Sequence, residues 1–68
     1  QRELLHKVAG EAYAYAETVY KSSESQIKLA QALEYATQQL GRKGIKVTPA
    51  EIRAAIEAAY LKSQNPVQ

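Results

Sequence analysis

One short stretch decides the fold, and it reads Gly44-Ile45-Lys46-Val47-Thr48-Pro49-Ala50-Glu51-Ile52. Glycine at its first position can adopt the left-handed conformation that closes a helix, because glycine has no side chain to clash there. The next residue, Ile45, can then fold back onto the last helical turn. The start of this stretch therefore predicts the end of a helix that lies upstream.

The second half of the same stretch predicts the start of a new helix. Thr48, Pro49 and Glu51 have the spacing of an N-cap residue, a first helical residue and a capping-box partner. Val47 precedes the cap and is placed to contact Ile52 in the first turn. We therefore expect two helices joined by a short connection whose geometry is specified residue by residue.

The upstream helix is expected over residues 24–43. Its apolar residues recur at steps of three and four, as on one face of an amphipathic helix. The predicted face consists of Ile27, Ala30, Leu33, Ala36 and Leu40, widened by Leu29 and Ala32. Ser23 is followed by Gln26 three residues later, which is the spacing of a capping box. We therefore expect this helix to begin near Glu24.

A first helix is expected over residues 2–20. The same periodicity places on one face Leu5, Val8, Ala12, Tyr15, Ala16 and Val19. Gly10 lies inside this segment, where a glycine costs about 1 kcal/mol relative to alanine. Gly10 either permits close contact with another helix, which is the interpretation we prefer, or marks a weak N-terminal section of this helix.

The third helix is expected over residues 49–61, and the polar residues 63–68 that follow are expected to form a disordered tail. Its apolar side consists of Ile52, Ala55, Ile56, Ala59 and Tyr60. No segment alternates with the period of a strand, and the connections are short. The sequence therefore predicts an all-α fold, a small three-helix domain over residues 1–62 whose first helix could be extended and project.

The composition argues against an enzyme. The 68 residues contain a single histidine, His6, and no Cys or Asp. Metal sites usually combine several such ligands, and nucleophilic or acid–base catalysis needs convergent partners that His6 lacks. Gly41 and Gly44 lie too close together in sequence for a phosphate-binding loop. We therefore expect no catalytic site, no metal, no cofactor and no small-molecule substrate.

Charge and chain start give further expectations. The formal net charge of +2 and the pI of about 9.0 are too mildly basic to indicate nucleic-acid binding by themselves. The chain has no Met and opens with the polar residues Gln1-Arg2-Glu3. We expect an N-terminal segment to have been removed, and simple loss of the initiator Met is the alternative. No apolar run approaches the roughly 18 residues that span a bilayer. We expect these residues on their own to be soluble.

Alanine and tyrosine supply more than half of the apolar residues, with 12 and five copies. One interpretation is self-association through smooth helix faces, with contacts from Ala54, Ala58, Tyr13 and Tyr20. Two simpler readings compete with it: alanine is the best helix former, and tyrosine rings are often buried with the hydroxyl at the edge of the core. Contact of exposed tyrosines with a membrane surface is a further alternative.

A basic cluster, Arg42, Lys43 and Lys46, lies around the predicted end of the second helix. Cations near a helix C-terminus complement the helix dipole, which explains the cluster without any ligand. The same charges could instead contact anionic lipid headgroups or the phosphates of a nucleic acid. These readings stay open at the level of the sequence.

Four motifs, taken together, resemble one known family. They are Ala12-Tyr13-Ala14-Tyr15-Ala16-Glu17, Lys28-Leu29-Ala30-Gln31-Ala32-Leu33-Glu34-Tyr35, the stretch from Gly44 to Ile52, and Ile56-Glu57-Ala58-Ala59. Their order and spacing over residues 8–61 are similar to those in the C-terminal region of phage holins of the LL-H type, superfamily 6. These are helix-packing and turn motifs rather than catalytic ones.

The resemblance implies a small phage membrane protein with an N-terminal transmembrane segment followed by a soluble domain. Such holins assemble in the host inner membrane and permeabilise it so that lysis can proceed. It implies that the removed segment is the membrane helix, that the full-length protein forms a homo-oligomer, and that this domain faces the cytoplasm. We therefore expect a non-enzymatic domain that promotes or regulates the assembly of membrane pores.

Two other functions compete with this one. The chain could be a small nucleic-acid-binding module in which the helix over residues 49–61 acts as a recognition helix. The long polar side chains of that region are Glu51, Arg53, Glu57 and Lys62, and the two glutamates would repel phosphates. Nucleic acid is therefore the less favoured partner. A general adaptor domain without enzymatic activity also fits the sequence.

Overall fold

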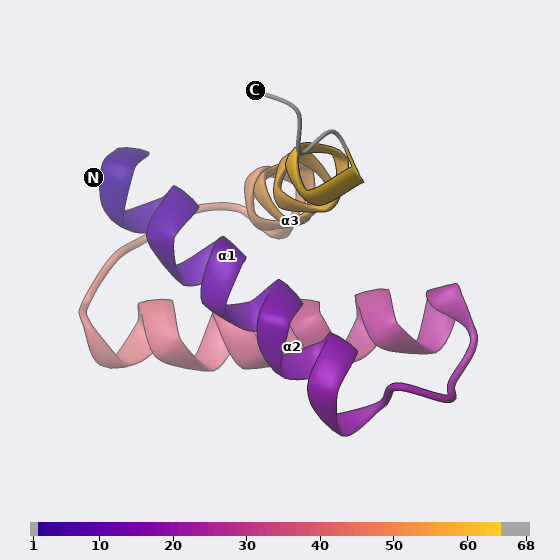
Figure 1. The fold of residues 1–68 in the computed structure, drawn as a ribbon. Coiled ribbons are helices and arrows are strands. Elements are labelled where there is room, and N and C mark those ends of the chain that lie inside the picture. The colour runs from indigo at the N-terminus through magenta and orange to yellow at the C-terminus, as the bar shows by residue number, and fades with distance from the viewer. Residues whose placement is uncertain (1, 65–68) are drawn as a thin grey trace.

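A computed structural model describes residues 2–64, and it contains three helices in that range (Figure 1): α1 is Arg2–Val19, α2 is Ser25–Arg42 and α3 is Pro49–Gln64. Helix α1 crosses the face of α2 at a large angle, and α3 packs against both. No strand is present among the described residues. The predicted all-α, three-helix fold is confirmed, although α1 is no longer than α2, since each has 18 residues.

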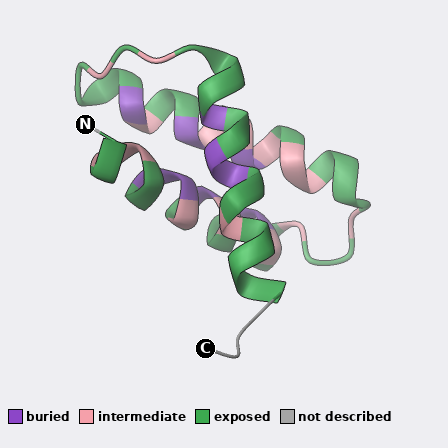
Figure 2. Cartoon of the chain, turned by 90° about the horizontal axis from the view of Figure 1, so that it is seen from above, coloured by how far each residue is buried: buried purple, intermediate pink, exposed green. Residues whose placement is uncertain are grey.

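The core is small and consists mostly of alanine. Figure 2 shows the buried residues on the sides of the helices that face one another. They are Val8, Ala9, Ala12, Ala16, Ala32, Ala36, Leu40, Ile52, Ala55 and Ile56. Five of the six buried alanines lie on α1 and α2, and small side chains on both helices let their backbones approach closely. Close helix packing is therefore one role of the alanines.

The buried face of α2 differs from the predicted one. Ile27 is 45% exposed and Ala30 is also exposed, whereas Leu29 packs against the core. Successive helical residues are separated by about 100°, so Ile27 points about 160° away from Leu29. The predicted and the observed buried faces of α2 share Leu33, Ala36 and Leu40. Periodicity alone therefore favoured a face that begins at Ile27, whereas the observed face begins at Leu29.

Three other residues that were predicted to face the core are largely exposed. They are Tyr15 and Val19 near the end of α1 and Tyr60 near the end of α3. Val19 ends α1, while the rings of Tyr15 and Tyr60 lie at the margin of the core, against Tyr35 and Tyr13 respectively. The apolar pattern therefore continues beyond the part of each helix that is buried.

The connection after α2 has the predicted geometry. Gly44 has a φ of 73°, in the left-handed region. The backbone N–H of Ile45 donates to the carbonyl of Leu40 at 2.9 Å, and that of Gly44 donates to Gly41 at 3.1 Å. These two bonds form a Schellman motif, which satisfies carbonyl groups that the end of a helix would otherwise leave unpaired.

The predicted capping box at the start of α3 is also confirmed. The backbone N–H of Thr48 donates to Glu51 Oε1 at 2.8 Å, and the backbone N–H of Glu51 donates to Thr48 Oγ1 at 3.1 Å. Val47, just before the cap, packs against the core that contains Ile52. The connection between α2 and α3 is thus held at both ends by hydrogen bonds.

The predicted capping box at the start of α2 is wrong. The N-cap of α2 is Glu24, and it makes no side-chain cap hydrogen bond. Ser23 lies one residue too early, and its backbone N–H donates to the carbonyl of Tyr20 at 2.9 Å. Because Ser23 closes the turn that follows α1, it cannot also cap α2 through Gln26.

Helix α3 extends further than predicted. Helix α3 continues past the predicted end to Gln64, and Ser63 Oγ donates to the carbonyl of Tyr60 at 2.8 Å. The predicted disordered tail is therefore wrong at positions 63 and 64, while residues 65–68 lie outside the described residues.

The predicted close contact at Gly10 in α1 is also absent, because a Cβ added there would meet no atom of a neighbouring element within 4 Å.

Candidate functional site

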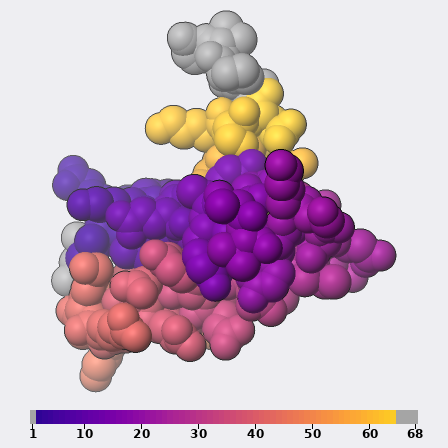
Figure 3. Space-filling view, turned by 60° about the horizontal axis from the view of Figure 1, so that its bottom comes forward, coloured from indigo at the N-terminus to yellow at the C-terminus, as the bar shows by residue number. Residues whose placement is uncertain are grey.

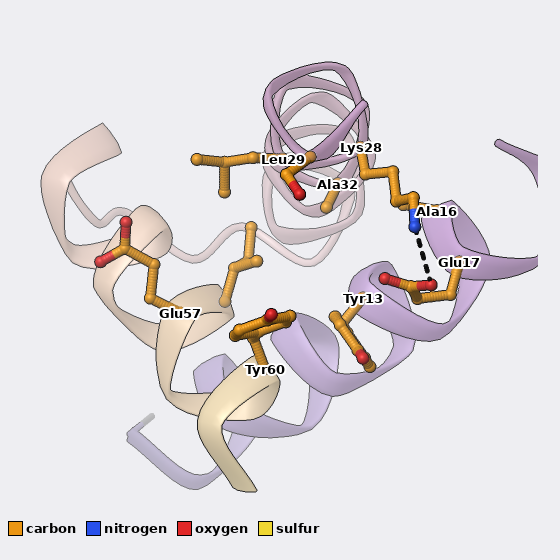
Figure 4. Close-up of a pocket in the computed structure, with 10 residues that line it drawn as sticks. Tyr13, Ala16, Glu17, Lys28, Leu29, Ala32, Glu57 and Tyr60 are labelled. Carbon is orange, nitrogen blue, oxygen red and sulfur yellow. Dashed lines mark hydrogen bonds and ion pairs between the residues drawn. The ribbon is translucent and has the colours of Figure 1, made fainter. Parts of the chain in front are cut away.

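A groove of about 240 Å³ opens between the three helices (Figure 4). It is lined by Tyr13, Ala16, Glu17, Ser25, Lys28, Leu29, Ala32, Ile56, Glu57 and Tyr60. Its floor is apolar, and the charged side chains lie at its margins. The volume lies below the roughly 300–1,000 Å³ of most small-molecule sites, so the groove could accept an apolar side chain rather than a cofactor.

Tyr13 and Tyr60 form one wall of this groove and join α1 to α3. Their rings meet edge to face, with centroids 6.0 Å apart and planes at 72°. The Tyr13 hydroxyl lies 2.9 Å from Ser63 Oγ. The structure places the ring and the hydroxyl of Tyr13 in contacts within the chain, and its predicted contact with another copy stays a prediction.

The opposite wall contains an ion pair between α1 and α2. Lys28 Nζ lies 3.2 Å from Glu17 Oε1, and both side chains are only partly exposed (Figure 4). This pair and Glu57 are the ionisable groups of the groove besides its two tyrosines. Lys28 is thus the one cation among the described residues that line the groove, and it is already paired with one of the two carboxylates there.

A second cluster of tyrosines joins the end of α1 to α2. The rings of Tyr15 and Tyr35 are stacked with centroids 4.7 Å apart, and Tyr20 meets Tyr15 edge to face at 6.3 Å. Desolvation raises the pKa of Tyr20 above its ordinary value, and Tyr15 and Glu34 act in the same direction. Tyr35 was not among the predicted site residues, because its sequence distance from Tyr15 conceals the contact.

A shallower groove of about 340 Å³ lies between the start of α1 and the start of α3. Its lining residues are Arg2, Leu5, His6, Val47, Glu51, Ala54 and Ala55. His6 lines this groove as an exposed residue, and among residues 2–64 no group of three His, Cys, Asp or Glu side chains could hold a metal ion. This groove brings the chain start close to the connection between α2 and α3.

Comparison with known families decides the class of this protein. The family of bacteriophage holins of superfamily 6, the LL-H type, matches residues 1–63. The chain belongs to this holin family. The resemblance noted from the four sequence motifs is thereby confirmed. No curated protein and no solved structure matches the chain significantly. Holins act in phage lysis of the host cell, and family membership gives this chain a holin-like role in lysis.

Among residues 2–64, every helix is too short or too polar to cross a bilayer.

The four residues predicted for self-association do not form one surface. Ala54 and Ala58 are exposed on the outer face of α3, one turn apart. Tyr13 is half-buried beside Tyr60, and Tyr20 is half-buried beside Tyr15 at the end of α1. The outer face of α3 in this holin domain therefore presents the two alanines without either tyrosine.

The predicted basic residues of the holin domain are brought together. Arg42 is the last residue of α2, Lys43 is its C-cap, and Lys46 lies in the connection to α3. All three are exposed. Their positions at the end of α2 agree with a role beside the helix dipole, and they leave the charged groups accessible to a partner.

Proposed function

We propose that this chain is the domain of a phage holin that promotes side-by-side assembly of membrane-anchored copies during host lysis. The observation that carries the proposal is an apolar face of α3 that the three-helix fold leaves uncovered. Family membership supplies the context of lysis, and the face supplies a contact. No chemical reaction is involved, since the proposed work is association.

Helix α3 is apolar on both of its faces. Its inner face contributes Ile52, Ala55 and Ile56 to the core, while its outer face exposes Ala50, Ala54, Ala58 and Leu61. Leu61 is 60% exposed despite its size. An exposed apolar strip of this kind is typical of a surface that contacts another element, so a partner is expected to cover the outer face. We infer that this element is α3 of another copy.

The residues of this outer face suit a helix–helix contact. Ala54 and Ala58 are one turn apart, and small side chains at this spacing let two helix backbones approach closely. Arg53 and Glu57 flank the face and pair with each other at 3.3 Å. A two-fold arrangement would place the same face of both copies together, so a self-complementary apolar strip is sufficient.

Anchoring to a membrane makes a weak contact sufficient. We propose that a transmembrane helix precedes the domain formed by residues 1–62 and holds it at the cytoplasmic side of the host inner membrane. Tethering raises the effective concentration of neighbouring copies to the millimolar range, so contacts too weak to dimerise the free domain can still bias clustering. The upstream coding sequence tests the anchor directly: about 20 consecutive apolar residues are expected.

The contact is tested by single-cysteine crosslinking, because the chain has no native cysteine. Ala58→Cys is placed on the proposed face, and Gln38→Cys on the exposed side of α2 is the matched control. Each variant is attached through an N-terminal His-tag to neutral vesicles that contain nickel-chelating lipid, and a short bis-maleimide is added. Dimers are expected with Ala58→Cys and not with Gln38→Cys. Equal yields, or dimers from the control alone, would refute the α3 contact.

A further inference from the structure

We propose that one end of the domain is a binding surface for anionic phospholipid headgroups. This basic end consists of Arg2 at the start of α1 together with Arg42, Lys43 and Lys46 at the connection between α2 and α3. The inference rests on the proposed function only in requiring a membrane next to the domain. It concerns how the domain is oriented against that membrane, whether or not copies associate through α3.

The fold brings this end together from segments that are far apart in the sequence. Arg2 lines the same groove as Val47, the residue that follows Lys46. Figures 1 and 3 show the first turn of α1 and the connection between α2 and α3 at the same edge of the molecule, with the connection between α1 and α2 at the opposite edge. A chain that enters from a membrane segment before α1 would therefore bring this end closest to the lipid.

The connection holds its charges in a defined place. Ile45 and Val47 both pack against the core, so the intervening Lys46 is directed outward and is exposed. The Schellman bond from Ile45 to Leu40 and the capping box at Thr48 hold the two ends of this segment. Because the backbone is already ordered, presenting these side chains to a partner requires little further loss of backbone conformational entropy.

The helix dipole explains only part of this charge. Arg42 and Lys43 lie at the C-terminus of α2, where cations are favourable. Arg2 lies in the first turn of α1, where a cation is unfavourable, and Lys46 lies beyond α2. The two ion pairs found within residues 2–64 join Lys28 to Glu17 and Arg53 to Glu57. Neither pair therefore involves any of the four cations of the basic end.

The charge is also distributed unevenly between the two edges of the molecule. The basic end has four cations, and the acidic side chains near it are Glu3 and Glu51, of which Glu51 is engaged by the Thr48 backbone. Around the connection between α1 and α2, Lys21 and Lys28 are matched by two carboxylates, Glu17 and Glu24, and Lys28 is paired with Glu17. Cations outnumber carboxylates four to two at the basic end and equal them, two to two, around the other connection, so an anionic surface would attract the basic end more strongly.

The expected strength follows from general membrane electrostatics. Each Lys or Arg next to an anionic bilayer strengthens binding about fivefold, so four charges together contribute on the order of several hundredfold. Because the Debye length falls from about 10 Å at 0.1 M salt to about 3 Å at 1 M, the binding should be lost at high salt. Vesicles of phosphatidylglycerol mixed with phosphatidylcholine provide the anionic surface, and pure phosphatidylcholine provides the neutral one.

The test is co-sedimentation of the 68-residue chain with these two kinds of vesicle. The variant Arg42→Gln/Lys43→Gln/Lys46→Gln removes three charges from the basic end. The control Lys21→Gln/Lys28→Gln/Lys62→Gln removes three charges elsewhere, so both variants change the formal net charge from +2 to −1. Binding to anionic vesicles is expected to weaken by about a hundredfold in the first variant and only severalfold in the control.

Several outcomes would overturn the inference. Equal weakening in both variants would show that net charge alone matters, and equal binding to neutral vesicles would exclude headgroup charge. Tighter binding to duplex DNA than to the anionic vesicles, lost in the same variant, would assign the basic end to nucleic acid. If circular dichroism shows that the triple variant is unfolded, the single change Lys46→Gln, outside the helices, replaces it with an expected fivefold loss.

The result is separable from that of the proposed self-association. Crosslinking through Ala58→Cys uses neutral vesicles and an artificial tether, so it does not depend on the basic end. Normal crosslinking without selective lipid binding would refute this inference alone. Selective lipid binding without crosslinking would refute the α3 contact alone.

Discussion

The ring of Tyr13 on α1 meets the ring of Tyr60 on α3 edge to face, at 6.0 Å between centroids, and the Tyr13 hydroxyl lies 2.9 Å from Ser63 Oγ. These contacts join the middle of the first helix to the last turns of the third. They also explain why α3 continues to Gln64 although its sequence becomes polar after Leu61. In a domain whose core is mostly alanine, two large rings supply a considerable part of the contact between these helices.

A double-mutant cycle on this pair should measure a favourable coupling. Tyr13→Ala and Tyr60→Ala are each expected to lower the free energy of unfolding, and the double variant less than the sum, with a coupling of about 0.5–1.5 kcal/mol. Urea unfolding followed by circular dichroism gives the four values. Additive effects would mean that the rings do not interact in solution. Thr18→Ala, on the exposed side of α1, is the control.

Gly10 and Gly44 should respond to alanine in opposite directions. Gly10 lies within α1 with open space around it, so Gly10→Ala should stabilise the domain by about 0.5–1 kcal/mol. Gly44 has a φ of 73°, so Gly44→Ala should destabilise it by about 1–2 kcal/mol. Thermal unfolding of both variants compares them directly. A loss of stability in Gly10→Ala would indicate a close contact there after all.

Replacing Thr48 or Ser23 by alanine should change the free energy of unfolding by different amounts, although both residues have the sequence spacing of a capping box. Thr48 caps α3 through its hydroxyl, so Thr48→Ala should cost about 1 kcal/mol, within the range of about 0.5–2 kcal/mol known for N-caps. Ser23 caps no helix through its side chain, so Ser23→Ala should change the free energy of unfolding by less than about 0.5 kcal/mol. Equal losses in the two variants would contradict the assigned caps.

Buried and exposed alanines should tolerate enlargement differently. Ala36 is fully buried on α2, so Ala36→Leu should overpack the core and lower stability by about 1–3 kcal/mol. Ala58→Leu, on the exposed face of α3, adds the same atoms and should change the stability of the monomer by less than about 0.5 kcal/mol. Chemical denaturation at low protein concentration separates the two. A large loss with Ala58→Leu would place that residue inside the fold.

The raised pKa of Tyr20 predicts a loss of stability at high pH. The unfolded chain releases this proton near the ordinary tyrosine pKa of about 10, whereas the fold disfavours the ionised form. The contribution is therefore fully present below pH 10 and is lost as the pH rises through the raised value. Wild type should lose more stability above pH 10 than Tyr20→Phe does. Ultraviolet titration should assign to Tyr20 a tyrosinate that forms above pH 10, and formation below pH 10 would contradict this.

Local motifs explain why most of the fold was predictable. The Schellman motif at Gly44 and the capping box at Thr48 are formed by residues within a few positions of one another, so sequence spacing alone specifies their hydrogen bonds. The Ser23 motif has the same spacing and does not form, because the chain uses Ser23 to close the turn after Tyr20. A capping signature therefore predicts a helix start reliably only when the flanking turn does not compete for the residue.

The candidate surfaces were less predictable. The alanine-rich composition and the basic cluster made Ala54, Ala58 and the basic residues candidates for contacts, and the fold leaves all of them exposed. Sequence spacing could not reveal that Tyr13 contacts Tyr60 or that Tyr15 stacks on Tyr35, since these pairs are far apart in sequence and depend on how the helices cross. The groove between the three helices was likewise invisible, because each helix contributes only part of its lining.

The sequence by itself determined the three helices, the rigid connection between α2 and α3, and membership of the holin family, because each depends on local patterns or on their order along the chain. Only the tertiary structure decided which side of α2 is buried, why α3 runs to Gln64, and which charges gather at the basic end. The physical reason is that a helix with apolar residues on more than one face fits several packing arrangements equally well. Which face becomes buried depends on contacts with the other helices, and those contacts are not local.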